Sequence, residues 1–122
     1  NLDWNIKDWD KKLMKIENNI KFDIVISNPP YIPTNDIKIL KKEVKKYDPF
    51  VALNGGKDGL EAYRSILSKL TNVIKSNGKI FLEIGEGQEN CVTKIAIEHG
   101  FLPKKYKKDL SGVTRVIMFI VK

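Results

Sequence analysis

The chain has 122 residues, of which 42% are hydrophobic and 30% are charged, a balance typical of a globular domain. No apolar run approaches the roughly 18 residues that a transmembrane helix needs, and no signal peptide opens the chain, so we expect a cytoplasmic protein. Cys91 is the single cysteine, which excludes an internal disulfide. The net charge of +7 is compatible with RNA or ribosome proximity, and equally with a lysine-rich composition.

The first half of the chain contains one strongly apolar segment. Residues 1–21 are polar and mixed, and they predict a loop with one short helix near Lys11–Glu17. Phe22–Ile26 is apolar at four of five positions, which is typical of a strand covered on both faces inside a parallel sheet. After Asn28-Pro29-Pro30-Tyr31, capping side chains predict a helix over Asp36–Tyr47. Its lysines face either solvent or RNA.

The second half of the chain predicts an alternation of helices and strands. Asp58 and Glu61 have the spacing of a capping box, and the apolar period after them predicts a helix that ends at Asn77-Gly78. The remaining expected elements are a strand over Lys79–Ile84, a helix over Gln88–His99 with Cys91, Val92, Ile95 and Ala96 facing inward, and strands over Phe101–Lys108 and Val113–Val121 joined by a turn at Asp109–Gly112.

This order predicts an α/β fold of one domain, or part of one, with a mostly parallel sheet. The short link between the last two strands requires an antiparallel hairpin at one edge. The sequence contains no G-x-G turn of the kind that seats a nucleotide cofactor between a strand and a helix. Gly55-Gly56 and Gly85-x-Gly87 are interpreted as turn glycines. No spacing of His, Cys and Asp residues indicates a metal site.

The segment Asn28-Pro29-Pro30-Tyr31 has a defined chemical capacity. Because proline has no backbone N–H and a fixed φ, the loop is stiff and offers carbonyl groups without matching donors. The Asn28 side-chain oxygen and the Pro29 carbonyl could accept both hydrogens of a planar NH2 group, and Tyr31 could pack on its face. This would aim the nitrogen at a methyl sulfonium, with catalysis by positioning and electrostatics. Taken alone, the segment is equally compatible with a turn that ends an edge strand.

With this context, the chain resembles the C-terminal part of the catalytic domain of the HemK/PrmC family, the release factor glutamine methyltransferases. The resemblance covers residues 22–122. It includes Asn28-Pro29-Pro30-Tyr31-Ile32-Pro33, Asp48-Pro49 with Ala52-Leu53, Gly55-Gly56 with Asp58-Gly59-Leu60 and Tyr63-Arg64, Leu82-Glu83-Ile84-Gly85 with Gln88, and Asp109-Leu110 with Gly112, Arg115 and Val116.

The resemblance implies a Rossmann-like class I methyltransferase fold, S-adenosylmethionine as cofactor, and peptide chain release factors as protein substrates. It implies that Asn28 contacts both cofactor and substrate amide, that Pro29, Pro30 and Tyr31 line the glutamine pocket, and that an upstream tryptophan contacts the adenine of the cofactor. Trp9 fits that last role better than Trp4. The family's N-terminal helical domain and glycine-rich cofactor loop have no counterpart in these 122 residues.

The sequence therefore predicts methylation of the side-chain amide nitrogen of the glutamine in the Gly-Gly-Gln motif of release factors. Two alternatives stay open. A nucleic-acid adenine-N6 methyltransferase would use the same segment to hold a flipped base. A non-catalytic fragment would only bind a partner.

Overall fold

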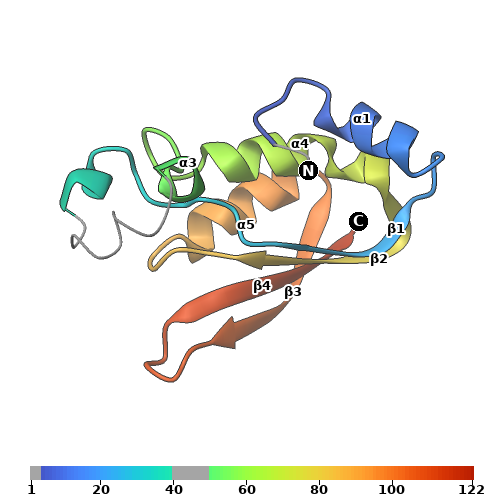
Figure 1. The fold of residues 1–122 in the computed structure, drawn as a ribbon. Coiled ribbons are helices and arrows are strands. Elements are labelled where there is room, and N and C mark those ends of the chain that lie inside the picture. Colours follow the sequence, from blue (N-terminus) through green and yellow to red (C-terminus); the bar gives the residue numbers. More distant parts are fainter. Residues whose placement is uncertain (1–3, 40–49) are drawn as a thin grey trace.

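The computed structural model describes residues 4–39 and 50–122. Its elements in chain order (Figure 1) are α1 (Trp9–Ile16), β1 (Phe22–Ser27), the 3-10 helix η1 (Asp36–Ile39), α3 (Phe50–Leu53), α4 (Glu61–Val73), β2 (Ile74–Glu83), α5 (Glu89–Glu98), β3 (Phe101–Lys108) and β4 (Thr114–Val121). The predicted helix over Asp36–Tyr47 is described only over η1, and the rest of it lies outside the described residues, as do four of its lysines.

The described strands form one mixed sheet in the order β1-β2-β4-β3. β1 and β2 are parallel, with Ser27 opposite Leu82, whereas β4 is antiparallel to both β2 and β3. Among the described strands the sheet is therefore mixed and not mostly parallel as the sequence predicted, because β4 returns antiparallel beside β2. The antiparallel hairpin of β3 and β4 was predicted from the sequence and is confirmed. Helices α1, α4 and α5 lie on one side of the sheet (Figure 1).

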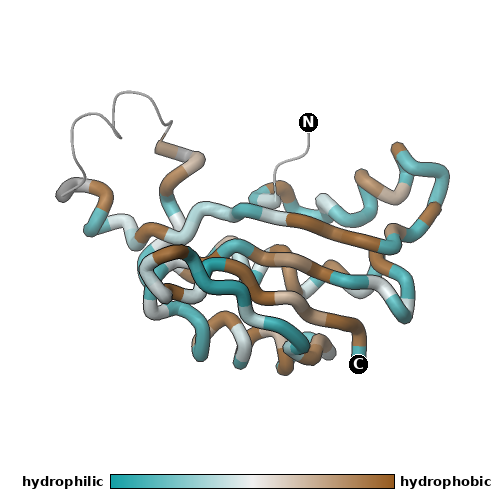
Figure 2. Tube along the Cα trace, turned by 90° about the horizontal axis from the view of Figure 1, so that it is seen from below, coloured by the Kyte–Doolittle hydropathy of each residue, from teal (hydrophilic) through white to brown (hydrophobic). Residues whose placement is uncertain are grey.

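The core lies between these helices and the sheet. Alternate residues of β2, Ile80 and Leu82, are completely buried, as expected when one face of a pleated strand is covered by helices. In Figure 2 hydrophobic tube segments lie in both strands and helices, while β3 is largely hydrophilic after its first residues. Other fully buried side chains of the core are Tyr63, Leu67, Phe101, Ile117 and Phe119.

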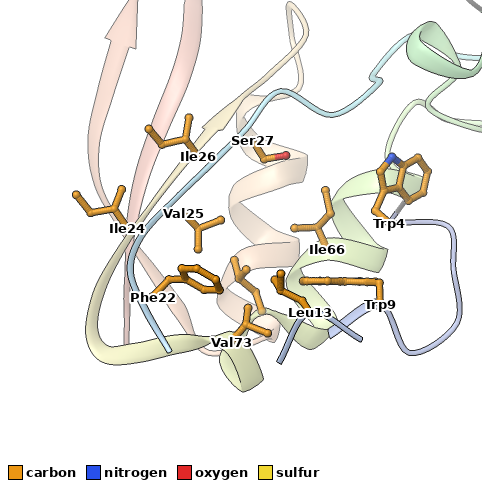
Figure 3. Close-up of a pocket in the computed structure, with 11 residues that line it drawn as sticks. Trp4, Trp9, Leu13, Phe22, Ile24, Val25, Ile26, Ser27, Ile66 and Val73 are labelled. Carbon is orange, nitrogen blue, oxygen red and sulfur yellow. The ribbon is translucent and has the colours of Figure 1, made fainter. Parts of the chain in front are cut away.

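Strand β1 differs from the expectation of a strand covered on both faces. Ile24 is 55% exposed and Ile26 is 78% exposed, and they point away from the side on which Val25 lies (Figure 3). Among the described residues β1 is an edge strand, paired with β2 alone, and no described element covers its second face. A run of apolar residues indicates that a strand is stabilised by burial. It does not indicate which neighbouring segments cover the strand.

The boundary between α4 and β2 also differs from the prediction. Helix α4 ends at Val73 instead of Asn77-Gly78, and β2 begins at Ile74. The pairing jumps from Phe22 opposite Ile74 to Ile24 opposite Lys79, so the intervening residues of β2 bulge out of register. Gly78 belongs to this bulge, where an added Cβ would collide with the Ile74 side chain. The glycine therefore lies in an irregular stretch of β2 and not at a helix end.

Two local predictions about helix residues are wrong. Asp58 does not cap α4; its Oδ1 accepts a hydrogen bond from the Leu60 backbone N–H at 3.0 Å, and its carboxylate pairs with Arg64. Cys91 is exposed, while Val92, Ile95 and Ala96 of the same helix are buried as predicted.

In residues 4–39 and 50–122, every helix is too short or too polar to cross a membrane.

Asp109 closes the turn of the β3–β4 hairpin. Its Oδ1 accepts hydrogen bonds from the backbone N–H groups of Ser111 and Val113, at 2.9 and 3.0 Å. Its Oδ2 accepts a hydrogen bond from Nε of Arg115 at 2.8 Å. The Arg115 and Val113 hydrogen bonds hold the pKa of Asp109 below its ordinary value of 3.8. The charged carboxylate therefore favours the folded hairpin.

We expect Asp109→Asn to lower the free energy of unfolding at pH 7 and to bring it closer to wild type at pH 3. Because the pKa is lower in the folded state than in the unfolded state, the stabilisation is fully present above about pH 4 and is lost as the pH falls through the folded-state pKa. Chemical denaturation at both pH values measures the difference.

Glu98→Gln is the control for this measurement, since Glu98 is exposed and its side chain makes no hydrogen bond or ion pair within the described ranges. A deficit of D109N that is the same at pH 7 and pH 3 would contradict a charge-dependent role for Asp109.

Candidate active site

The segment Asn28–Tyr31, called the elbow below, leaves the carboxyl end of β1. Pro29 and Pro30 are buried, Tyr31 is half-buried, and Asn28 is exposed. A cavity of about 320 Å³ lies beside the elbow. Its lining consists of Asn28, Pro29, Pro30, Tyr31, Ile32, Ala52 and Leu53. The structure thus brings together the four predicted substrate-binding residues at one cavity.

The elbow is held by a second segment, residues 53–56. Ile32 donates its backbone N–H to the Leu53 carbonyl at 3.2 Å and accepts a hydrogen bond from the Gly55 N–H at 2.9 Å. This is a parallel bridge between Ile32 and Asn54. Thr34 adds two contacts, from its N–H to the Gly56 carbonyl at 2.9 Å and from Oγ1 to Oδ1 of Asn54 at 2.8 Å. The chain after the prolines is therefore fixed by backbone pairing.

Glycines let the neighbouring loops approach the elbow closely. A Cβ on Gly55 would lie 2.9 Å from the Pro30 carbonyl oxygen, and one on Gly85 would lie 2.9 Å from Cδ2 of Tyr31. At Gly59, which has φ +75°, a Cβ would collide with the Tyr31 carbonyl oxygen. From the sequence, Gly55 and Gly85 were expected only to be turn glycines. In the structure they are also positions where the loops contact the elbow.

The half-buried side-chain amide of Gln88 and the buried phenol of Tyr63 join the loops behind the elbow. Nε2 of Gln88 donates to the carbonyl oxygens of Tyr31 and Gly59, at 3.0 and 3.3 Å. Oε1 of Gln88 accepts a hydrogen bond from the Gly85 N–H at 3.0 Å and lies 3.4 Å from the Tyr63 hydroxyl. Tyr63 also donates to the Glu83 carbonyl at 3.0 Å. Burial raises the pKa of Tyr63, so its hydroxyl stays protonated and remains a donor.

The elbow itself has free acceptor capacity. In the part of the chain that the structure describes, the Asn28 side chain makes no hydrogen bond, and this exposed residue lines the cavity. Pro29 and Pro30 contribute carbonyls but no N–H groups. Over residues 4–39 and 50–122, no group of three His, Cys, Asp or Glu side chains is placed to hold a metal ion. The arrangement is suited to accepting hydrogen bonds from a planar NH2 group.

A second cavity, of about 410 Å³, lies beside β1 and reaches Ser27, the residue before Asn28. Both candidate tryptophans, Trp4 and Trp9, line it (Figure 3). Trp9 is 8% exposed and donates its indole N–H to the Ser65 carbonyl at 3.4 Å. Trp4 is half-buried, and its carbonyl accepts a hydrogen bond from the Ser65 hydroxyl at 2.8 Å. The contact of Trp9 with a cofactor remains a prediction.

The family model described as Eco57I restriction-modification methylase matches residues 2–85, a span that includes β1 and the elbow. The chain belongs to this methylase family.

Curated relatives of this methylase chain are named differently from the family model. A release factor glutamine methyltransferase of Thermodesulfovibrio yellowstonii is 43% identical over 97 residues, which make up 80% of this chain and 35% of that relative. Other relatives share the name. The chain therefore spans about a third of the length of these curated relatives. The resemblance to the release factor glutamine methyltransferases is confirmed.

Solved structures agree on the fold. A methyltransferase from Pyrococcus furiosus has a TM-score of 0.57 at 17% identity, over 98% of this chain and 59% of that one. The M1.HpyAVI-SAM complex has a TM-score of 0.51 at 13% identity, over 93% of this chain and 52% of that one. At these identities the likeness concerns the fold alone. It confirms the predicted Rossmann-like methyltransferase fold.

We expect Gly59→Ala to destabilise the methylase chain more than Gly112→Ala does. Both glycines have positive φ, at +75° and +83°, so both substitutions carry the cost of a left-handed alanine, about 1–2 kcal/mol. Only the Cβ at position 59 meets the Tyr31 carbonyl, whereas nothing lies within 4 Å of a Cβ at position 112. Chemical denaturation of both variants measures the difference, and equal losses would show that the elbow does not press on Gly59.

Proposed function

We propose that the protein to which this methylase chain belongs uses S-adenosylmethionine to methylate the side-chain amide nitrogen of a glutamine, in the Gly-Gly-Gln motif of peptide chain release factors. The observation that carries this proposal is the unpaired Asn28 amide beside the elbow cavity. The named relatives support the choice of substrate. Since release factors act on ribosomes, the proposal implies a cytoplasmic location near ribosomal RNA.

The elbow would bind the glutamine amide through both of its hydrogens. Asn28 Oδ1 and the Pro29 carbonyl oxygen accept one hydrogen bond each, Pro30 lines the pocket, and the Tyr31 ring packs on the amide plane. Hydrogen bonds in these directions withdraw the nitrogen lone pair from conjugation with the carbonyl group. The nitrogen then forms a bond to the incoming methyl carbon, and one of its protons leaves to solvent. Asn28, Pro29 and Tyr31 are thus the residues that act on the reacting nitrogen.

The apolar cavity beside β1 fits one side of the cofactor. It has two tryptophans for contact with an adenine ring and reaches Ser27, next to Asn28. S-adenosylmethionine would supply an electrophilic methyl group, whose bond to sulfur breaks with its electron pair on sulfur. In this proposal Trp9 contacts the adenine from the protein interior, and Asn28 lies between cofactor and substrate.

Adenine methylation in nucleic acid is the second candidate, and the family model named for a restriction-modification methylase favours it. The exocyclic amine of adenine is also a planar NH2 group, so the elbow could bind it with the same two acceptors. The net charge of +7 agrees with a nucleic-acid substrate as well.

We expect Asn28→Ala, made in the full-length protein, to lower kcat about 100-fold or more while the protein stays folded. Asn28 is exposed, so its side chain contributes little to stability. Methyl transfer to a release factor with a Gly-Gly-Gln motif is compared with transfer to an adenine-containing oligonucleotide. Asn90→Ala, at an exposed asparagine of α5, is the matched control and should match wild type.

Transfer to the oligonucleotide alone would replace the first candidate with the second. Wild-type transfer to either substrate that is unaffected by N28A would refute the role of the elbow.

The 122-residue chain by itself is expected to bind S-adenosylhomocysteine weakly or not at all and to show no turnover. The cavity that would hold the cofactor is bounded on one side by the unpaired edge of β1, and the sequence contains no glycine-rich cofactor loop. Isothermal titration calorimetry tests this. Saturable one-to-one binding to the isolated chain would show that these residues form a complete cofactor site.

A further inference from the structure

We propose that Gln88 is a positioning residue for the elbow, and that it acts on the reaction through Tyr31. The inference rests on the function proposed above, which it deepens. Gln88 lies just before α5 and does not line the elbow cavity. Its side chain instead joins three loops: the one after β1, the one before α4 and the one after β2.

The hydrogen bonds use both ends of the Gln88 amide. Nε2 donates its two hydrogens to the carbonyl oxygens of Tyr31 and Gly59, at 3.0 and 3.3 Å. Oε1 accepts the Gly85 N–H at 3.0 Å and lies 3.4 Å from the Tyr63 hydroxyl. A carboxylate would place a negative oxygen against two carbonyls, and a hydrocarbon side chain would remove the hydrogen bonds to the Tyr31 and Gly59 carbonyls and to the Gly85 N–H. The site is therefore specific for an amide.

The backbone around Gln88 is arranged to admit this side chain. A Cβ on Gly85 would lie 2.9 Å from Oε1 of Gln88, and a Cβ on Gly59 would lie 2.9 Å from Nε2. The carbonyl of Gln88 accepts the Val92 N–H at 2.9 Å, which ties its backbone to α5. Helix α5 thus supplies a rigid base from which the amide reaches the elbow.

The consequence for catalysis concerns the Tyr31 ring. Gln88 donates a hydrogen bond to the Tyr31 carbonyl, and Gly85 leaves room for the Tyr31 ring, since a Cβ at position 85 would lie 2.9 Å from Cδ2 of that ring. The ring is the wall on which the substrate amide would pack. Loss of the Gln88 hydrogen bond lets the elbow shift, and a displacement of about 1 Å in a positioned group costs up to about 100-fold in rate.

The test uses Gln88→Met in the full-length protein, because methionine has the same length without hydrogen-bonding groups. Asn90→Leu is the matched control, since it also replaces an amide by a hydrocarbon chain on α5, at an exposed position. Two quantities are measured. The first is the fluorine NMR signal of 3-fluorotyrosine at position 31, which is assigned by its loss in Tyr31→Phe. The second is kcat for the substrate that the wild-type protein methylates.

We expect Q88M to shift or broaden the Tyr31 signal and to lower kcat about 10- to 100-fold, with the KM for S-adenosylmethionine within about twofold of wild type. N90L should change neither readout. In a Tyr31→Ala background, Q88M should lower kcat less than about threefold, because the ring through which it acts is gone.

An unchanged Tyr31 signal in Q88M would overturn the proposal, and so would an equal loss of kcat in both backgrounds. These outcomes are separate from the identity of the substrate. If wild type methylates the oligonucleotide and not the release factor, the proposed function fails while the role of Gln88 is still measured. If the wild-type protein methylates neither substrate, the Tyr31 NMR signal in Q88M alone tests whether Gln88 positions the elbow.

Discussion

An elbow made of two consecutive prolines cannot hold its position through its own backbone, because neither Pro29 nor Pro30 has an N–H group to donate. Its geometry must be fixed by donors on neighbouring residues. Here the Gly55 N–H pairs with Ile32 just after the elbow, and the Gln88 side chain donates to the Tyr31 carbonyl. The rest of the site depends on this external support, because only an elbow held in this way leaves the Asn28 side chain unpaired at a cavity.

The loops that support the elbow meet because of the sheet and the helix behind it. Parallel strands end at the same edge, so Ser27 of β1 and Leu82 of β2 bring the loops that follow them side by side. Helix α4 begins next to this edge, and its completely buried Tyr63 donates to the Glu83 carbonyl at the end of β2. The hydrophobic core thus determines where three loops converge. Small residues in those loops then determine how closely they approach.

The chain matches both a restriction-modification methylase family and release factor glutamine methyltransferases. The proposed site offers a chemical reason for this double match. A glutamine side chain and an adenine base both present a planar NH2 group, and two acceptors at Asn28 and Pro29 suit either one. In this proposal the elbow would select the type of nitrogen and not the molecule that carries it. Discrimination between a protein and a nucleic acid would then depend on surfaces beyond the elbow, where a loop or a flipped base must be accommodated.

The amino-acid sequence by itself determined the type and order of most elements, the β3–β4 turn and the chemical capacity of Asn28–Tyr31. These features depend on residues close together in the chain, as in the apolar run of β1 or the turn that begins at Asp109. Tertiary structure decided the exposure of Ile24 and Ile26, and the bulge in β2 that ends α4 at Val73.

Tertiary structure also decided how the elbow is held. Gln88 and Tyr31 are 57 residues apart, and nothing in the local pattern around either residue indicates the other. The same holds for Gly55 and Gly85, which look like turn residues until the elbow is placed against them. Periodicity and turn chemistry are local properties, whereas the close approach of backbones follows from packing between distant segments, and only the folded chain defines it.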